Sequence, residues 1–454
     1  MKLLARTALS VLAVVFTLTA QTKIPPVKFS DTRLDNGLRV IIAEDHYAPV
    51  YAIAVSYGVG SKDERKGRTG FAHLFEHMMF KGSEKVGAGE HFFLVFNNGG
   101  SMNGTTNTDR TIYFEVLPKN QLDLGLFLEA DRMRSLAITK ENLQNQKEAV
   151  KEERRLRLDN QPYGKTFERM TELAYDNFAY KHSVIGSMGD LDAASVEDVA
   201  DFFRTYYAPN NAVLALVGDL DTKQTLALVR KYFGDIPRQE APKPVDLSEP
   251  AMTAERRERM EDPLARLTLL TIAYKSPPGS HSDAQALAAL GTVFGQGESS
   301  RLYQKLVKEK ELCAQAGAGS MARMGPGLFT ISCLVRPGKN PQEAEAAISE
   351  EVAALHAALV SAKELQRAKV AARRAAISSR TSALSRAMQL ADDAVMYNDP
   401  NRINTTLEKR MAVTAVDIQN AAKTYLRTAN RVVIHTVPAT RPAGPSKGEA
   451  KKGN

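Results

Sequence analysis

The sequence contains no tryptophan and only two cysteines among its 454 residues. Two cysteines are too few to staple a chain of this size or to build a cysteine-rich zinc or iron–sulfur module, which excludes both classes. Beyond the first twenty residues, no apolar run is long enough to span a bilayer. Hydrophobic residues make up 43% and charged residues 25%, which is a globular composition, and the length predicts two or three domains.

The body of the chain also lacks a large excess of positive charge, because most of the net charge lies near the two ends. The formal net charge is +8, but Lys2 and Arg6 belong to the first segment and residues 441–454 carry a net +3. The body of the protein therefore has a net charge of about +3, which does not indicate a nucleic-acid partner.

The amino terminus has the pattern of a secretory signal peptide. Lys2 and Arg6 precede an apolar run over residues 8–18, and small residues follow it. We therefore expect residues 1–20 to be a signal peptide, and the mature protein to begin near Gln21 and to be periplasmic or secreted. The alternative is a retained membrane anchor, but the run is shorter than the roughly 20 residues that a span needs.

An internal repeat predicts two copies of one α+β domain. A helix-capping residue and an aspartate three positions later are followed, at the same spacing in both copies, by a tyrosine, an asparagine and an apolar strand. The first copy has Ser195, Asp198, Tyr206 and Asn211, and the second has Thr414, Asp417, Tyr425 and Asn430. We expect each copy to be a mainly antiparallel sheet with helices packed on one face. The predicted domains are residues 24–236 and 264–440, with a Pro-rich, charged linker over 237–263 and a disordered tail over 441–454.

One helix of the first copy carries the residues of a metal site. His73, Glu76 and His77 are spaced i, i+3 and i+4, which places them on one face of a helix. Two imidazoles at this spacing can bind one Zn²⁺, with a carboxylate positioned beside them. A solvated polar face is the alternative, but the neighbouring apolar side chains predict that this helix is largely buried.

The third protein ligand is expected from the helix predicted over residues 141–158. Leu143, Gln146, Val150 and Glu153 follow one apolar stripe, whereas Glu152 falls on the charged side. A carboxylate on the inward stripe is the better ligand, so we predict Glu153 rather than Glu152. The remaining glutamates of this helix are interpreted as a solvated face.

These motifs resemble the M16 family of zinc metallopeptidases, which includes pitrilysin and the mitochondrial processing peptidase. The resemblance rests on His73-x-x-Glu76-His77, on Glu153 seventy-six residues later, and on Asp159-Asn-Gln-Pro-Tyr-Gly164. It implies an α+β clamshell of two homologous α/β domains with the LuxS/MPP-like metallohydrolase fold. It also implies one Zn²⁺ per chain, held by His73, His77 and Glu153, with Glu76 as general base. Some members have a second glutamate where this chain has Gln146, so the resemblance does not carry a supporting acid role to this position and leaves the role of Gln146 open.

A substrate-binding segment is predicted over residues 98–106. This segment is rich in Gly and Asn, and an edge strand with few bulky side chains can pair its backbone with a peptide. The alternative is an ordinary hairpin turn. By the resemblance, Asn103 and Gly104, with Thr105 and Thr106 after them, form the substrate-binding edge.

The second copy has no His-x-x-Glu-His sequence, and its equivalent helix over residues 287–294 has no metal ligands. Where catalytic members of the family often have an aromatic residue, this chain has Ala314, which suggests incomplete substrate clamping. Cys313 and Cys333 flank a predicted hairpin, and the sequence leaves open whether they form a disulfide or lie apart as small apolar side chains.

The sequence therefore predicts an exported zinc metalloendopeptidase that hydrolyses peptides or unfolded polypeptide segments. The alternative is a noncatalytic structural or assembly subunit of the same family, but the complete set of His73, Glu76, His77 and Glu153 favours the enzyme. The resemblance also suggests a partner, either a metal-free homologue or a second copy in a homodimer. No nucleic acid and no stable membrane span are expected.

Overall fold

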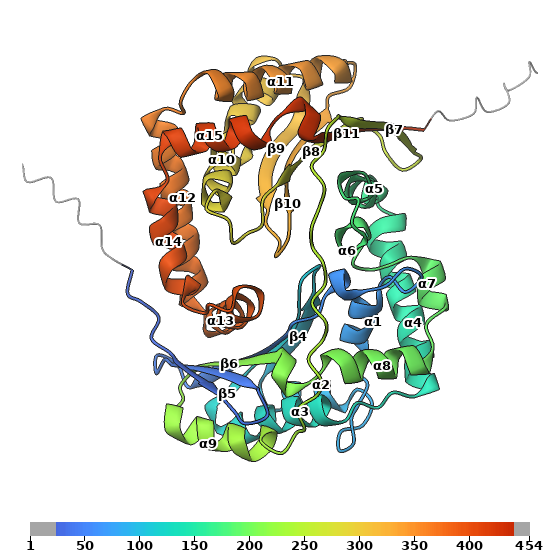
Figure 1. Ribbon diagram of the computed structural model, residues 1–454, viewed down its shortest axis with the longest axis vertical. Helices are drawn as coiled ribbons and strands as arrows, with labels where there is room; N and C mark the ends of the chain where they lie inside the picture. The colour runs from blue at the N-terminus through green and yellow to red at the C-terminus, as the bar shows by residue number, and fades with distance from the viewer. Residues whose placement is uncertain (1–23, 440–454) are drawn as a thin grey trace, which may run out of the picture.

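The computed structural model describes residues 24–439, which form two sheets surrounded by helices (Figure 1). The predicted signal peptide and the predicted tail lie outside the described residues. Within those residues, no helix is long and apolar enough to cross a membrane.

The first half of the chain forms a six-stranded sheet in the order β1-β2-β6-β3-β5-β4. Only β2 and β6 are parallel, and the other neighbours are antiparallel. The strands are β1 Ser30–Arg33, β2 Arg39–Glu44, β3 Val50–Tyr57, β4 Ser101–Thr106, β5 Thr111–Pro118 and β6 Ala212–Gly218. The apolar strand that the repeat predicts directly after Asn211 is β6.

Helices of the first half cover one face of this sheet, where alternate strand residues such as Val40, Ile53 and Leu214 are fully buried. The helices are α1 Phe71–Met78, α2 Glu90–Asn97, α3 Leu122–Arg134, α4 Lys140–Arg154, α5 Gly164–Ala174, α6 Phe178–Lys181, α7 Met188–Asp192, α8 Val196–Tyr206 and α9 Thr222–Phe233. A π-helical turn over Arg155–Asp159 extends α4, so the predicted helix over 141–158 is one structural unit with a change of pitch.

The second half repeats this arrangement with a five-stranded sheet in the order β7-β11-β8-β10-β9. Its strands are β7 Arg256–Asp262, β8 Leu269–Ser276, β9 Cys313–Met321, β10 Gly327–Val335 and β11 Arg431–Pro438. Its helices are α10 Ala284–Gly295, α11 Pro341–Ala357, α12 Ala362–Thr381, α13 Ala383–Tyr397, α14 Arg402–Ala412 and α15 Ala415–Tyr425. The predicted α+β class with two related domains is confirmed.

The two halves exchange helices across their second faces (Figure 1). Helix α13 of the second half packs Leu390 and Ala391 on the first sheet, against Ala54 and Ala215. In the same way, α5 of the first half packs Met170 against the second sheet. Each sheet therefore has its own helices on one face and a helix from the other half on the opposite face, and the halves are joined by apolar cores.

The repeat that the sequence predicts is a structural repeat as well. Both Ser195 and Thr414 accept a hydrogen bond from the backbone N–H three residues later and form capping boxes at α8 and α15. The Asn211 side chain then donates to the Tyr206 carbonyl at 2.8 Å, and Asn430 donates to the Tyr425 carbonyl at the same distance. Each asparagine therefore fixes the turn between the helix and the strand that follows it, β6 or β11.

The segment predicted as a linker, 237–263, ends in a strand. Residues 237–252 have no helix or strand, but β7 pairs in parallel with β11 along its full length. Its side chains are half-buried and exposed in alternation, and most of them are charged. A strand at the sheet edge needs no apolar face, so hydrophobic periodicity did not reveal it.

Cys313 and Cys333 form a disulfide between β9 and β10. The structure therefore selects cross-strand pairing from the two alternatives that the sequence left open. Both residues are fully buried in the core of the second half, where the bond also serves as an apolar contact.

Candidate metal centre

Helix α1 presents His73, Glu76 and His77 on one side while its apolar residues Leu74 and Phe75 are buried in the core. The N-cap is Gly70, with φ of 85°, where a Cβ would lie 2.5 Å from the Ile185 carbonyl oxygen. A glycine has no side chain to cap the helix. The buried carboxylate of Glu64 does so instead, because it accepts hydrogen bonds from the N–H groups of Gly70 and Ala72 at 2.8 Å each.

Helix α4 brings Glu153 to the two histidines. Glu153 Oε2 lies 3.1 Å from His77 Nε2 and 3.6 Å from His73 Nε2, and its side chain is 16% exposed. The other carboxylate oxygen pairs with Arg157 at 2.7 Å. Leu143, Gln146 and Val150 on the same stripe are buried, whereas Glu152 is 57% exposed and pairs with Arg155. The structure therefore places Glu153, and not Glu152, in the cluster.

The donor set of this cluster fits a zinc ion. One ligand atom from each of His73, His77 and Glu153 can be chosen so that all three lie within 4.8 Å of one another. Ligands at about 2.0–2.2 Å from a tetrahedral zinc would be separated by about 3.3–3.5 Å, close to the two distances observed. Two imidazoles and one carboxylate are also the protein ligands of known catalytic zinc sites, which leave a fourth position open.

The protonation states of the cluster favour metal binding. Burial and the neighbouring His77 lower the pKa of His73 to about 4, so this imidazole is neutral near pH 7, as a ligand must be. The hydrogen bond with His77 holds the pKa of Glu153 below its usual value. Burial raises the pKa of Glu76, although a hydrogen bond from Thr106 opposes this shift. A carboxylate with a raised pKa is suited to accept and return a proton.

Strand β4 lies directly against Glu76. The Thr106 hydroxyl donates to Glu76 Oε2 at 2.5 Å, and a Cβ on Gly104 would lie 3.0 Å from Glu76 Cγ. Glycine at this position therefore lets the strand approach the carboxylate closely. The strand is at the edge of its sheet and pairs only with β5 among the described residues.

Within the part of the chain that the structure describes, the other two predicted substrate-binding residues have hydrogen-bond partners other than Glu76. Asn103 Oδ1 accepts a hydrogen bond from the N–H of Gly104, and Arg110 donates to both oxygens of Thr105. The predicted site residues of β4 are therefore brought to the metal cluster through Gly104 and Thr106, and sequence reasoning missed Glu64. No local pattern signals Glu64, because it caps α1 from six residues before the N-cap.

A second group of potential ligands, His91, Glu115 and Glu129, is completely buried between α2, β5 and α3. His91 Nε2 lies 2.5 Å from Glu115, but Glu129 is engaged by both Nε and Nη2 of Arg132. Burial raises the pKa of Glu115 and of Glu129 to about 7 and lowers that of His91 to about 3. Arg132 supplies the positive charge that a bound metal ion would otherwise supply, so this cluster is an internal ion-pair network.

The fold and the cluster agree with the families that the chain matches. Residues 39–187 match the family model described as insulinase (peptidase family M16), and residues 193–371 match the peptidase M16 inactive domain. The chain belongs to the M16 peptidase family.

Relatives and solved structures support this assignment along nearly the whole chain. The zinc protease PqqE of Helicobacter pylori is 30% identical over 92% of this chain and 94% of the relative. A crystal structure of a protease from Helicobacter pylori has a TM-score of 0.87 at 28% identity, covering 91% of this chain and all of that one. The periplasmic protease PqqL of Escherichia coli has the same fold, with a TM-score of 0.75 at 20% identity, but the match covers 92% of this chain and only 48% of PqqL.

Proposed function

We propose that this protein is an exported zinc metalloendopeptidase that cleaves peptides or unfolded polypeptide segments. The observation that carries the proposal is the juxtaposition of three elements: the ligand atoms of His73, His77 and Glu153, the carboxylate of Glu76, and the free edge of β4. The relative named zinc protease supports the reaction class and the metal.

In the proposed reaction, the metal and the side chains of this chain have separate chemical roles. Bound zinc would supply a Lewis acid that polarises the scissile carbonyl and lowers the pKa of water toward about 7. Glu76 takes a proton from the attacking water and returns it to the leaving amine as the C–N bond breaks. Thr106 orients the Glu76 carboxylate through its hydrogen bond. Arg157, which pairs with the second oxygen of Glu153, holds that ligand in place.

The substrate would add to the sheet as an extended strand. The outer edge of β4 presents backbone N–H and C=O groups that can pair with any peptide, and this favours flexible segments over folded proteins. Because Gly104 lacks a side chain, a peptide on this edge can lie close to Glu76. Backbone pairing gives affinity with little sequence selectivity, in keeping with a broad range of peptide substrates.

We further propose that a second chain, either a metal-free homologue or another copy, completes the active enzyme. PqqL is about twice as long as the part that this chain matches, so a single polypeptide there contains a further half of comparable size. Ala314, where an aromatic residue is expected from the family, lies in the exposed edge strand β9 of the second half. A second chain would supply substrate contacts that this chain lacks.

The proposal predicts that the purified protein, loaded with one equivalent of zinc, cleaves an unstructured peptide. A chelator should abolish the cleavage, and added zinc should restore it, because the three ligands cannot polarise the carbonyl alone. The measurement is fluorescence of a quenched peptide, followed with and without a metal-free homologue from the same cell. A faster rate with the homologue supports the heteromer, and an unchanged rate supports the single chain or homodimer. Cleavage that survives complete zinc removal contradicts the metallopeptidase proposal.

Export is proposed from the leader pattern of residues 1–20, and the description of PqqL as periplasmic supports it. The protein recovered outside the cytoplasm should begin near Gln21. An exported protein that still begins at Met1, as shown by its intact mass, would contradict cleavage of a signal peptide.

A further inference from the structure

A turn of the second half is seated on side chains of the first half. Three consecutive residues between β9 and β10 each make one hydrogen bond across the halves. The N–H of Met324 donates to Asp109 at 3.0 Å, the N–H of Gly325 donates to the Tyr180 hydroxyl at 2.8 Å, and Tyr175 donates to the Pro326 carbonyl at 2.9 Å. This turn, residues 322–326, is therefore fixed at three successive points.

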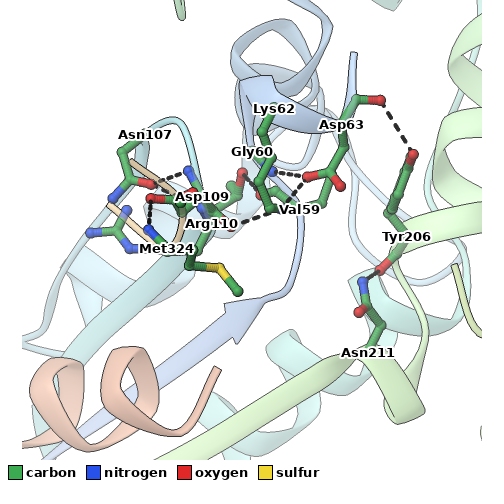
Figure 2. Close-up of polar contacts among 12 residues, drawn as sticks. Val59, Gly60, Lys62, Asp63, Asn107, Asp109, Arg110, Tyr206, Asn211 and Met324 are labelled. Atoms are coloured by element: carbon green, nitrogen blue, oxygen red, sulfur yellow. Dashed lines mark hydrogen bonds and ion pairs between the residues drawn. The ribbon is translucent and has the colours of Figure 1, made fainter. Parts of the chain in front are cut away.

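Asp109 is the centre of this contact (Figure 2). Both of its carboxylate oxygens accept hydrogen bonds, one from Met324 and the other from the Tyr180 hydroxyl at 2.7 Å. Its backbone carbonyl accepts from Lys62 Nζ at 3.2 Å, and its backbone N–H donates to Asn107 at 2.7 Å. Asp109 and Tyr180 are each only 2% exposed. A buried carboxylate whose two oxygens are both hydrogen-bonded fixes the backbone around it, because losing the Met324 or the Tyr180 bond leaves a buried polar atom without its partner.

The loop that contains Asp109 directly follows the substrate strand β4. Arg110 Nη1 donates to the carbonyl and hydroxyl oxygens of Thr105 at 2.9 Å each, and Arg110 Nε pairs with Asp392 of α13 at 2.9 Å. Thr106, the last residue of β4, donates to Glu76. The end of β4 is thus linked to the second half at two places, Met324 through Asp109 and Asp392 through Arg110.

We propose that Asp109, together with Tyr180, is a positioning residue that holds β4 against Glu76 by anchoring the β4–β5 loop to the second half. The inference rests on the proposed function for its effect on catalysis, but its structural part does not. It gives the metal-free half a positioning role in the reaction, since the turn at residues 322–326 holds the loop that follows β4. Misplacement of a bound substrate by about 1 Å can cost about 100-fold in rate.

The test uses Asp109→Asn and Tyr180→Phe in the full zinc-loaded chain. Asparagine keeps the shape of aspartate but turns an N–H group toward the donors of Met324 or Tyr180, and phenylalanine removes only the hydroxyl. The matched control is Asp123→Asn, because Asp123 also accepts a tyrosine hydroxyl, that of Tyr232 at 2.7 Å, at an exposed site on α3. Hydrogen exchange of β4 and kcat/KM for two peptides are measured, one of about ten residues and one that spans only the scissile bond.

Both variants should retain zinc, and their melting temperatures should stay within a few degrees of the wild type. The β4 amides that pair with β5 should exchange about tenfold faster, because the loss of one hydrogen bond to a carboxylate costs about this factor in stability. The kcat/KM of the long peptide should fall about tenfold and that of the short peptide much less, because only the long one pairs along β4. The control should match the wild type. Unchanged β4 exchange in both variants, or an equal loss for both peptides, overturns the inference. If the wild type cleaves neither peptide, the proposed function fails, and β4 exchange alone decides the role of Asp109.

Discussion

Glu76→Gln should lower kcat for peptide cleavage by about 10²–10⁴-fold, the usual contribution of a general acid–base group. Glutamine has nearly the same shape as glutamate and can still accept the Thr106 hydrogen bond, but it cannot take a proton from water. Because Glu76 is not among the three clustered ligand residues, the variant should bind zinc as the wild type does. The measurement is single-turnover cleavage of a quenched peptide at matched zinc content.

The pH dependence of wild-type activity is an independent test of the role of Glu76. Activity should fall on the acid side as Glu76 becomes protonated. Thr106→Val removes the hydrogen bond that stabilises the ionised carboxylate, so the pKa of Glu76 should rise and the acid limb should move to higher pH. An acid limb that does not move in Thr106→Val would show that another group controls it. Cleavage by zinc-loaded Glu76→Gln at the wild-type rate would exclude Glu76 as the base.

Glu153→Gln should lower zinc affinity by more than about 100-fold and abolish cleavage. Residues that only support a ligand typically contribute about 10–100-fold to metal affinity, so losing a ligand should cost more. Glutamine also removes the negative charge that faces both imidazoles at 3.1 and 3.6 Å. Zinc affinity is measured by competition with a chelator of known strength.

Glu152→Gln is the matched control, since it makes the same change one residue earlier on α4. Its side chain is 57% exposed and pairs with Arg155, away from the cluster, so zinc affinity and kcat should stay close to those of the wild type. The reverse ranking, with Glu152→Gln poor in zinc and Glu153→Gln unaffected, would contradict the ligand assignment.

The helical periodicity of the sequence located the candidate site because each predicted ligand lies on a helix with a distinct apolar stripe. His73 and His77 are one turn apart on α1, and Glu153 continues the stripe of Leu143 and Val150, which are buried. A stripe fixes the direction of a side chain without knowledge of the partner helix. That the two helices meet at these residues follows from the tertiary structure, and the family resemblance predicted it.

Other contacts between distant residues were not predicted. Asp109 meets Met324 across 215 positions, and nothing near either residue signals the contact. The exchange of α5 and α13 between the sheets is similar, because an apolar helix face does not indicate which sheet it covers. Strand β7 was missed for a different reason, since its alternating charged residues have the composition of a linker.

Anomalous diffraction from crystals of the zinc-loaded protein, recorded on both sides of the zinc absorption edge, would locate the bound zinc directly. We predict one strong peak per chain, bounded by Nε2 of His73, Nε2 of His77 and a carboxylate oxygen of Glu153, with Glu76 beside it and not bound to it. A zinc peak elsewhere in the chain, with none between these three residues, would contradict the account.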